Sequence, residues 1–147
     1  PPRSTLFPYT TLFRSTCTAK PFYPVNVDLT IFIDVGPEII TGSTRMKAGT
    51  ATKMVLNMIS TATMIRLGKV YGNLMVDLMA VNEKLVDRGI RIIQDFTNLD
   101  LENSRRILVA AKMSVKTALV MVKKDCNLDV AEKLLLDANG FLRDVID

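Results

Sequence analysis

The sequence contains no histidine and no tryptophan, and only two cysteines among its 147 residues. The absence of histidine excludes His-containing catalytic triads, His-based acid–base catalysis and most zinc sites. Cys17 and Cys126 stand far apart and form no CxxC motif. A disulfide framework is therefore not expected, and a reducing compartment, the cytoplasm, is the expected location.

Long apolar runs and a strong charge imbalance are also missing. No apolar stretch approaches the roughly 20 residues that cross a bilayer, and the start lacks the basic-then-apolar order of a signal peptide. The net charge is +4, but residues 1–26 hold three cations and no acid, and the remainder holds 16 basic and 15 acidic residues. This balance does not predict nucleic-acid binding, so neither a nucleic acid nor a membrane is an expected partner.

What the chain has is the composition of a globular domain, with 48% hydrophobic and 23% charged residues. Residues 1–24 are the exception, because they nearly duplicate STLF as TTLF and contain no acid and no helical period. They resemble a translated adapter or linker scar. We expect this segment to be non-native and disordered, and the alternative is an irregular native arm.

The next part of the chain shows strand and helix patterns. Residues 27–35, VDLTIFIDV, are rich in β-branched residues, which predicts a buried strand of a parallel sheet. Apolar residues recur with helical spacing over 44–67, and Gly68 suits the C-cap. Residues 71–82 alternate briefly like a short strand, and Asn82 is a plausible N-cap for the following helix. The methionines of the first helix and of the segment after it are predicted to be core residues: Met54, Met58, Met64, Met75 and Met79.

The chain changes character after about residue 98. Four short helices are expected there, at residues 101–112, 114–124, 128–138 and 140–146. Their cap candidates are Ser114 and either Asn127 or Asp129. We therefore predict an α/β fold, with part of a parallel α/β domain over 25–98 and a helical lobe over 99–147.

The most distinctive segment is TGSTRMKAGTATK, residues 41–53, which holds five hydroxyl side chains, three cations and no acid. Cations at a helix start are unfavourable by a few tenths to about 1 kcal/mol each, because the helix dipole is positive there. One compensation is an anion held by backbone N–H groups, by Ser43 and Thr44, and by Arg45 and Lys47. The other interpretation is that Ser43 or Thr44 is only an N-cap and that the cations are solvated. No Walker A motif fits the segment.

Glu38 follows the predicted strand, at the edge where open α/β sheets bind their ligands. A carboxylate at that place is suited to bonding sugar hydroxyls or to acting as an acid or base. The alternative is an acid in a surface turn.

Residues 36–50 contain GPE, TGSTR and KAGT in close succession. This segment closely resembles N-acetylmuramic acid 6-phosphate etherases, and the resemblance runs from about residue 27 to residue 147. Those bacterial enzymes share the sugar-isomerase (SIS) fold, a parallel α/β sandwich, with the glucokinase regulatory protein. The resemblance implies that Ser43 and Thr44 contact a sugar phosphate. It also implies that Arg45 and Lys47 support the site and that Glu38 lies at its rim.

The resemblance also implies a reaction. The family cleaves the D-lactyl ether of N-acetylmuramic acid 6-phosphate by elimination and water addition, giving N-acetylglucosamine 6-phosphate and D-lactate in peptidoglycan recycling. Carboxylates supply the acid and the base, so no metal and no cofactor are expected. The full-length protein is expected to be a homodimer.

The chain departs from the family in its length. The catalytic glutamates of the family lie in a first half that this chain lacks, so no catalytic residue can be assigned to it. We expect the C-terminal half of an etherase, inactive alone. The alternative is a non-catalytic sugar-phosphate-binding regulator of the glucokinase regulatory protein type.

Overall fold

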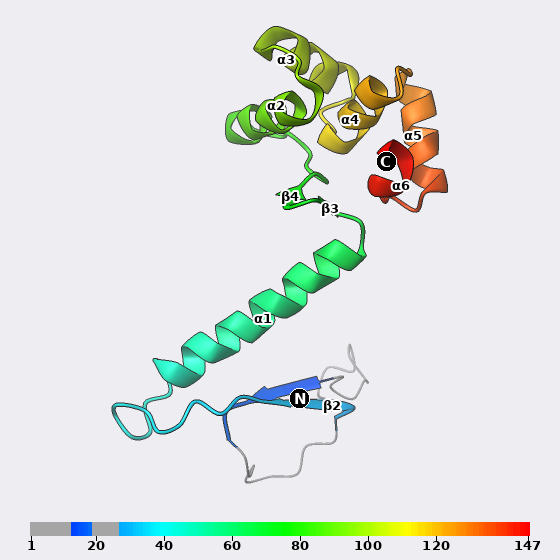
Figure 1. Cartoon of the computed structure of the whole chain (residues 1–147). Helices are drawn as coiled ribbons and strands as arrows, with labels where there is room; N and C mark the ends of the chain where they lie inside the picture. The colour runs from blue at the N-terminus through cyan, green and yellow to red at the C-terminus, as the bar shows by residue number, and fades with distance from the viewer. Residues whose placement is uncertain (1–12, 19–26) are drawn as a thin grey trace, which may run out of the picture. The chain divides into compact units, whose positions relative to one another are not determined.

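The computed structural model describes residues 13–18 and 27–147 (Figure 1). The chain divides into two compact units, Pro1–Thr61 (unit 1) and Ala62–Asp147 (unit 2), and each is described by itself. The described residues form short strands and six helices. This mixture confirms the predicted α/β class.

Unit 1 contains a two-stranded parallel sheet. In it β1 (Phe13–Thr16) pairs with β2 (Leu29–Phe32), with Phe13 opposite Leu29 and Thr16 opposite Phe32. The strand and the parallel pairing predicted for residues 27–35 are therefore present. The predicted burial is not, because Leu29 is 57% exposed and Phe32 48% exposed. Two strands do not cover their own faces.

The position of β1 differs from the expectation of disorder over residues 1–24. Within that segment the structure describes residues 13–18, and four of them form this strand. Residues 1–12 and 19–24 lie outside the described part of the chain. The non-native origin of the segment stays a prediction.

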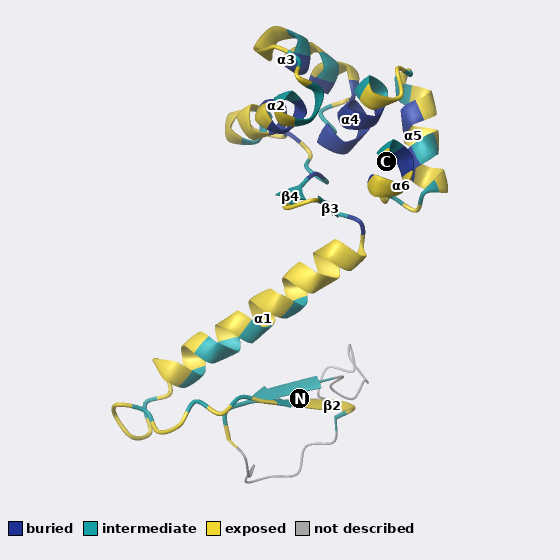
Figure 2. Cartoon of the chain, viewed as in Figure 1, coloured by how far each residue is buried: buried dark blue, intermediate teal, exposed yellow. Residues whose placement is uncertain are grey.

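Helix α1 (Lys47–Arg66) begins three residues later than predicted, after a turn at residues 44–46. It ends as expected, because Gly68 has a φ of +67° and the Lys69 N–H donates to the Met64 carbonyl at 3.1 Å. None of the residues of α1 is buried, and its ribbon carries exposed positions along its whole length (Figure 2). The prediction that its methionines are core residues is wrong for this chain: Met54, Met58 and Met64 are 58%, 58% and 38% exposed.

Unit 2 begins at Ala62, within the last part of α1, and continues with a hairpin of β3 (Val70–Tyr71) and β4 (Leu74–Met75). The two-residue connection begins at Gly72, whose φ of +58° suits the tight hairpin turns that require a positive φ. The short strand suggested by the alternation over residues 71–82 is therefore confirmed only for β4. Val76, directly after it, is fully buried.

Five helices complete unit 2, and their positions confirm the sequence prediction within a few residues. They are α2 (Glu83–Thr97), α3 (Leu101–Ala110), α4 (Val115–Lys123), α5 (Leu128–Asp137) and α6 (Arg143–Ile146).

The predicted caps are also present. Asn82 Oδ1 accepts from the Leu85 N–H at 2.9 Å, and Ser114 Oγ accepts from the Thr117 N–H at 3.3 Å. Asn127, rather than Asp129, caps α5. The cap of α3, Asp100, is one that the sequence analysis did not name.

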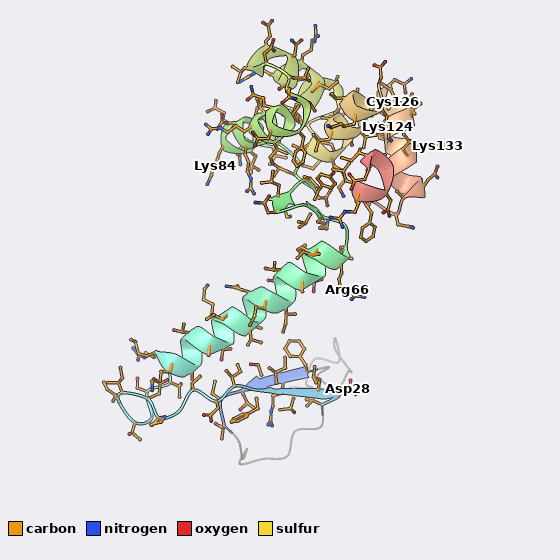
Figure 3. All side chains as sticks on the ribbon, in the orientation of Figure 1. Asp28, Arg66, Lys84, Lys124, Cys126 and Lys133 are labelled. Carbon is orange, nitrogen blue, oxygen red and sulfur yellow. The ribbon has the colours of Figure 1, made fainter. Side chains whose placement is uncertain are left out.

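The helices of unit 2 enclose one apolar core. Leu108, Val115 and Leu119 are fully buried in it. Gly89 lets α2 approach α4 closely, since an added Cβ would lie 2.9 Å from Val115 Cγ2. Charged side chains such as Lys84 and Lys133 project outward (Figure 3). Because α2 shares this core with α3 and α4, the expected boundary at 98/99 does not separate two cores.

Candidate functional site

The candidate site lies in unit 1, in the loop between β2 and α1. A tight turn shapes it, because the Ser43 N–H donates to the Ile40 carbonyl at 3.0 Å. Gly42, the third residue of this turn, has a φ of +86°, which favours glycine because it has no Cβ. The turn therefore fixes the backbone immediately before the hydroxyl and cationic side chains.

Glu38 closes the loop onto the start of α1. Its Oε2 accepts from the Lys47 N–H at 3.1 Å and its Oε1 accepts from the Ala48 N–H at 3.0 Å. In return, the Lys47 Nζ donates to the Pro37 carbonyl at 2.9 Å. The positive end of α1 therefore holds an anion, as its missing first-turn acid suggests, and that anion is a carboxylate of the chain itself.

The structure brings Glu38 and Lys47 into direct contact and places the other three predicted site residues between them in the chain. Ser43 is half-buried, while Thr44 and Arg45 are exposed. Neither the Ser43 nor the Thr44 side chain takes the cap position at Lys47 and Ala48, because Glu38 already accepts from both amides. The link spans nine residues of sequence, which local cap rules do not reach.

A depression opens beside this loop, with a volume of about 380 Å³. Ile39, Met46 and Met54 line it, together with Lys47, Thr50 and Ala51. Its wall is therefore almost wholly apolar.

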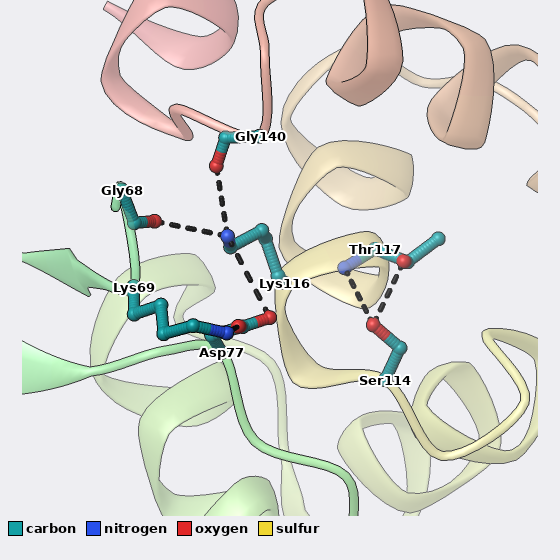
Figure 4. A network of polar contacts seen from close by, with 7 residues as sticks. All are labelled: Gly68, Lys69, Asp77, Ser114, Lys116, Thr117 and Gly140. Carbon is teal, nitrogen blue, oxygen red and sulfur yellow. Dashed lines mark hydrogen bonds and ion pairs between the residues drawn. The ribbon is translucent and has the colours of Figure 1, made fainter. Parts of the chain in front are cut away.

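A second polar cluster lies in unit 2, around the Lys116 ammonium (Figure 4). Its Nζ donates to the carbonyls of Gly68 at 2.9 Å and Gly140 at 2.8 Å, and it lies 3.6 Å from Asp77 Oδ1. Lys69 also donates to Asp77. Two of the Lys116 N–H groups therefore have carbonyl acceptors and the Asp77 carboxylate lies within ion-pair distance, so Lys116 ties three segments of unit 2 together.

The electrostatics of this cluster follow from its burial. Burial lowers the pKa of Lys116, although the charge of Asp77 opposes the shift. Burial also disfavours the ionised form of Asp77, but the Lys69 hydrogen bond and the Lys116 charge prevail and lower its pKa. The sequence pattern did not predict this cluster. The available signal was a lysine in the otherwise apolar run of α4.

The described residues show two further properties. Within residues 13–18 and 27–147, no three cysteine or acidic side chains gather in a way that could hold a metal ion. In the same part of the chain, no helix has the length and hydropathy needed to cross a membrane.

Fold and site together define a partial α/β domain with a helical lobe and a loop of hydroxyl and cationic residues at a helix start. Known proteins then identify the family. The chain is 54% identical over 121 residues to the N-acetylmuramic acid 6-phosphate etherase of Clostridium acetobutylicum. It is 50% identical over 132 residues to that of Bacillus subtilis and 49% identical over 137 residues to that of Salinibacter ruber. The chain belongs to the N-acetylmuramic acid 6-phosphate etherase family.

The extent of these matches shows which share of the family protein is present. They cover 82%, 90% and 93% of this chain but only 40%, 43% and 44% of the three relatives. The chain therefore spans less than half the length of the relatives it matches. No family model matches the chain.

Proposed function

We propose that this chain is part of a lyase that cleaves the D-lactyl ether of N-acetylmuramic acid 6-phosphate. The products are N-acetylglucosamine 6-phosphate and D-lactate, and the role is cell-wall sugar recycling in the cytoplasm. The observation that carries the proposal is the identity of about half of all matched positions to proteins named for this activity.

Within the proposed enzyme, the loop between β2 and α1 binds the sugar phosphate. Ser43 and Thr44 donate hydrogen bonds to the phosphate oxygens, and Arg45 and Lys47 supply positive charge. Glu38 holds the loop against α1 and forms the rim of the site. The support is the grouping of these side chains in one loop, tied at both ends by Glu38 and Lys47.

The surrounding protein in this proposal is a SIS-type α/β sandwich that acts as a homodimer. The strand β2 followed by the helix α1 supports the sandwich, because alternating strands and helices are the pattern of parallel α/β folds. The acid and base of the elimination step then come from outside this chain.

The test is a hybrid enzyme. In the Bacillus subtilis relative, the matched segment is replaced by the corresponding residues of this chain, and D-lactate release from N-acetylmuramic acid 6-phosphate is measured. We expect turnover within about tenfold of the parent enzyme, because binding and acid–base groups are then both present. A hybrid that folds and binds N-acetylglucosamine 6-phosphate without turnover would instead favour the alternative function, a non-catalytic sugar-phosphate-binding regulator.

The site assignment is tested in the same hybrid. Ser43→Ala should weaken binding of N-acetylglucosamine 6-phosphate by about 1.5–3 kcal/mol, the usual loss of a hydrogen bond to a charged group. Ser60→Ala is the matched control, since its exposed hydroxyl in α1 donates to the Asn57 carbonyl. Calorimetry that finds equal affinity for both variants would remove Ser43 from the phosphate site.

A further inference from the structure

Unit 1 exposes large apolar side chains on both its strand and its helix. We call these residues the unit 1 apolar surface, and each of them is about half exposed or more: Leu29 57%, Phe32 48%, Met46 62%, Met54 58%, Leu56 49% and Met58 58%. Figure 2 shows the exposed class covering most of α1. Soluble proteins seldom leave so many large apolar side chains of one compact unit uncovered, and such surfaces mark interaction sites.

The secondary structure points the same way. A helix whose apolar residues are spread around its circumference is normally buried on all sides, yet α1 has no buried residue. Parallel sheets occur almost only with both faces covered, and an isolated strand pair is marginal at best. Among the described residues, β2 is paired along one edge only, with β1. Both β2 and α1 therefore lack cover among the described residues.

The charge of this surface describes its partner further. Residues 39–61 contain the cations Arg45, Lys47 and Lys53 and no acidic residue. All three cations are exposed. Because Arg45 and Lys47 belong to the proposed phosphate site, Lys53 is the one of the three that a partner can use. A partner that covers this surface therefore needs apolar area and a carboxylate opposite Lys53, and its binding should weaken as salt screens the charges.

The length of the relatives indicates which polypeptide covers the unit 1 apolar surface. The chain covers about 40% of each relative, so more than half of each relative's polypeptide lies outside the match. A second copy of this chain fits less well, because an isologous contact buries one patch, whereas α1 needs cover on several sides. We propose that the unit 1 apolar surface is the docking surface for the remaining part of an etherase polypeptide, which it binds even as a separate chain.

The experiment is complementation in trans. This chain is co-expressed with the part of the Bacillus subtilis relative that the match leaves uncovered. We expect a soluble one-to-one complex by size-exclusion chromatography with light scattering. Amides of β2 and α1 should gain about 100-fold in hydrogen-exchange protection, because docking closes local opening. Amides of α4 should change little, since unit 2 already encloses its core.

Variants identify the surface. Met54→Glu combined with Met58→Glu should weaken the complex by about tenfold or more, the scale of loss for buried apolar contacts at an interface. Leu136→Glu on α5 is the matched control, because this leucine is 78% exposed but belongs to unit 2. Circular dichroism of each variant chain checks that helicity is retained.

Three results would overturn the proposal. The first is that the co-expressed part of the relative stays separate from this chain or insoluble. The second is that α1 gains the same hydrogen-exchange protection when this chain associates only with itself. The third is that the Leu136→Glu control loses as much affinity as the double methionine variant. D-lactate release is not the readout here. Docking without activity would therefore count against the proposed function, and failure to dock would count against this inference alone.

Discussion

Units 1 and 2 both cap the start of a helix with a side-chain oxygen, but they differ in how far they bury their apolar residues. In both, side-chain oxygens accept from the first amides of a helix: Glu38 does so for α1, and Asn82 does so for α2. In unit 2 the capped helices then enclose fully buried residues such as Ile93 and Leu119. In contrast, no residue of the capped helix α1 is buried, and only some are partly covered.

This difference separates local from global stability. Capping and helix propensity act within a few residues and are worth about 1 kcal/mol each, so they define α1 without any partner. Most of the stability of a protein helix comes from packing its apolar face, however. Unit 2 has that packing within itself, and the described residues of unit 1 do not.

The largest expected effect compares the two units directly. In the isolated chain, core amides of α2 and α4 should exchange at least about 10³-fold more slowly than amides of α1, relative to their unfolded rates. The reason is that core amides open only with global unfolding, which costs several kcal/mol. Hydrogen exchange followed by mass spectrometry measures both in one sample. Equal protection in α1 and α4 would mean that unit 1 is already covered in the isolated chain.

The second prediction concerns the buried charge of unit 2, the Lys116 ammonium. Lys116→Met should lower the free energy of unfolding of unit 2 by about 2–4 kcal/mol, because two backbone carbonyls lose a charged donor. For a domain of this size, that is a fall in melting temperature of about 10–20 °C. Thermal unfolding by circular dichroism measures it.

The control for this change is Lys133→Met, which removes an exposed lysine from α5 (Figure 3). It should leave the melting temperature nearly unchanged, as most surface substitutions do. If both variants melt alike, the contacts of Lys116 with Gly68 and Gly140 do not hold unit 2 together.

The contrast between the units also explains what the sequence could predict. The helices of unit 2 and three of its caps follow from local patterns, because Asn82, Ser114 and Asn127 bond amides only three residues away. Glu38 reaches across nine residues and Lys116 across 48, distances that no local pattern encodes. The cationic start of α1 left two interpretations open in the sequence, a bound anion and a simple N-cap with solvated cations. Neither interpretation predicted that the chain supplies the anion itself.

The burial of α1 and β2 was predicted wrongly for a related reason. Apolar periodicity reports what a segment buries in its complete protein, and this chain spans less than half of its relatives. The pattern at Met54 and Met58 therefore predicts a core that the described residues do not complete.

The third prediction, a smaller effect, compares the removal of one helix cap in each unit. Glu38→Ala and Asn82→Ala each remove a cap worth about 1 kcal/mol. In unit 2 the loss should lower global stability and shift the urea midpoint, because α2 is packed into the core. In unit 1 it should only speed exchange of the first amides of α1, by about fivefold for 1 kcal/mol. A global shift from Glu38→Ala would show that α1 is part of a cooperative core.

The smallest expected effect is a pH dependence confined to unit 2. The pKa of Asp77 lies below its ordinary value of 3.8, because the hydrogen bond from Lys69 and the charge of Lys116 outweigh the effect of burial. A lowered carboxylate pKa stabilises the folded state above the unfolded pKa, and this stability is lost as pH falls through the folded pKa. The carboxylate is about one-third exposed, so solvent screening should hold the effect below about 1 kcal/mol.

Asp77→Asn isolates this contribution from that of the other acids. Urea unfolding of unit 2 between pH 6 and pH 2 should show a shallower acid loss in Asp77→Asn than in the unchanged chain. Asp87→Asn is the matched control, because Asp87 pairs with Arg91 on the exposed face of α2, where both side chains are more than half exposed. Its acid loss should follow that of the unchanged chain. Identical pH profiles for all three proteins would mean that the Lys69–Asp77–Lys116 cluster contributes no more than a surface ion pair. The stability of unit 2 would then rest on its apolar core and on the carbonyl contacts of Lys116.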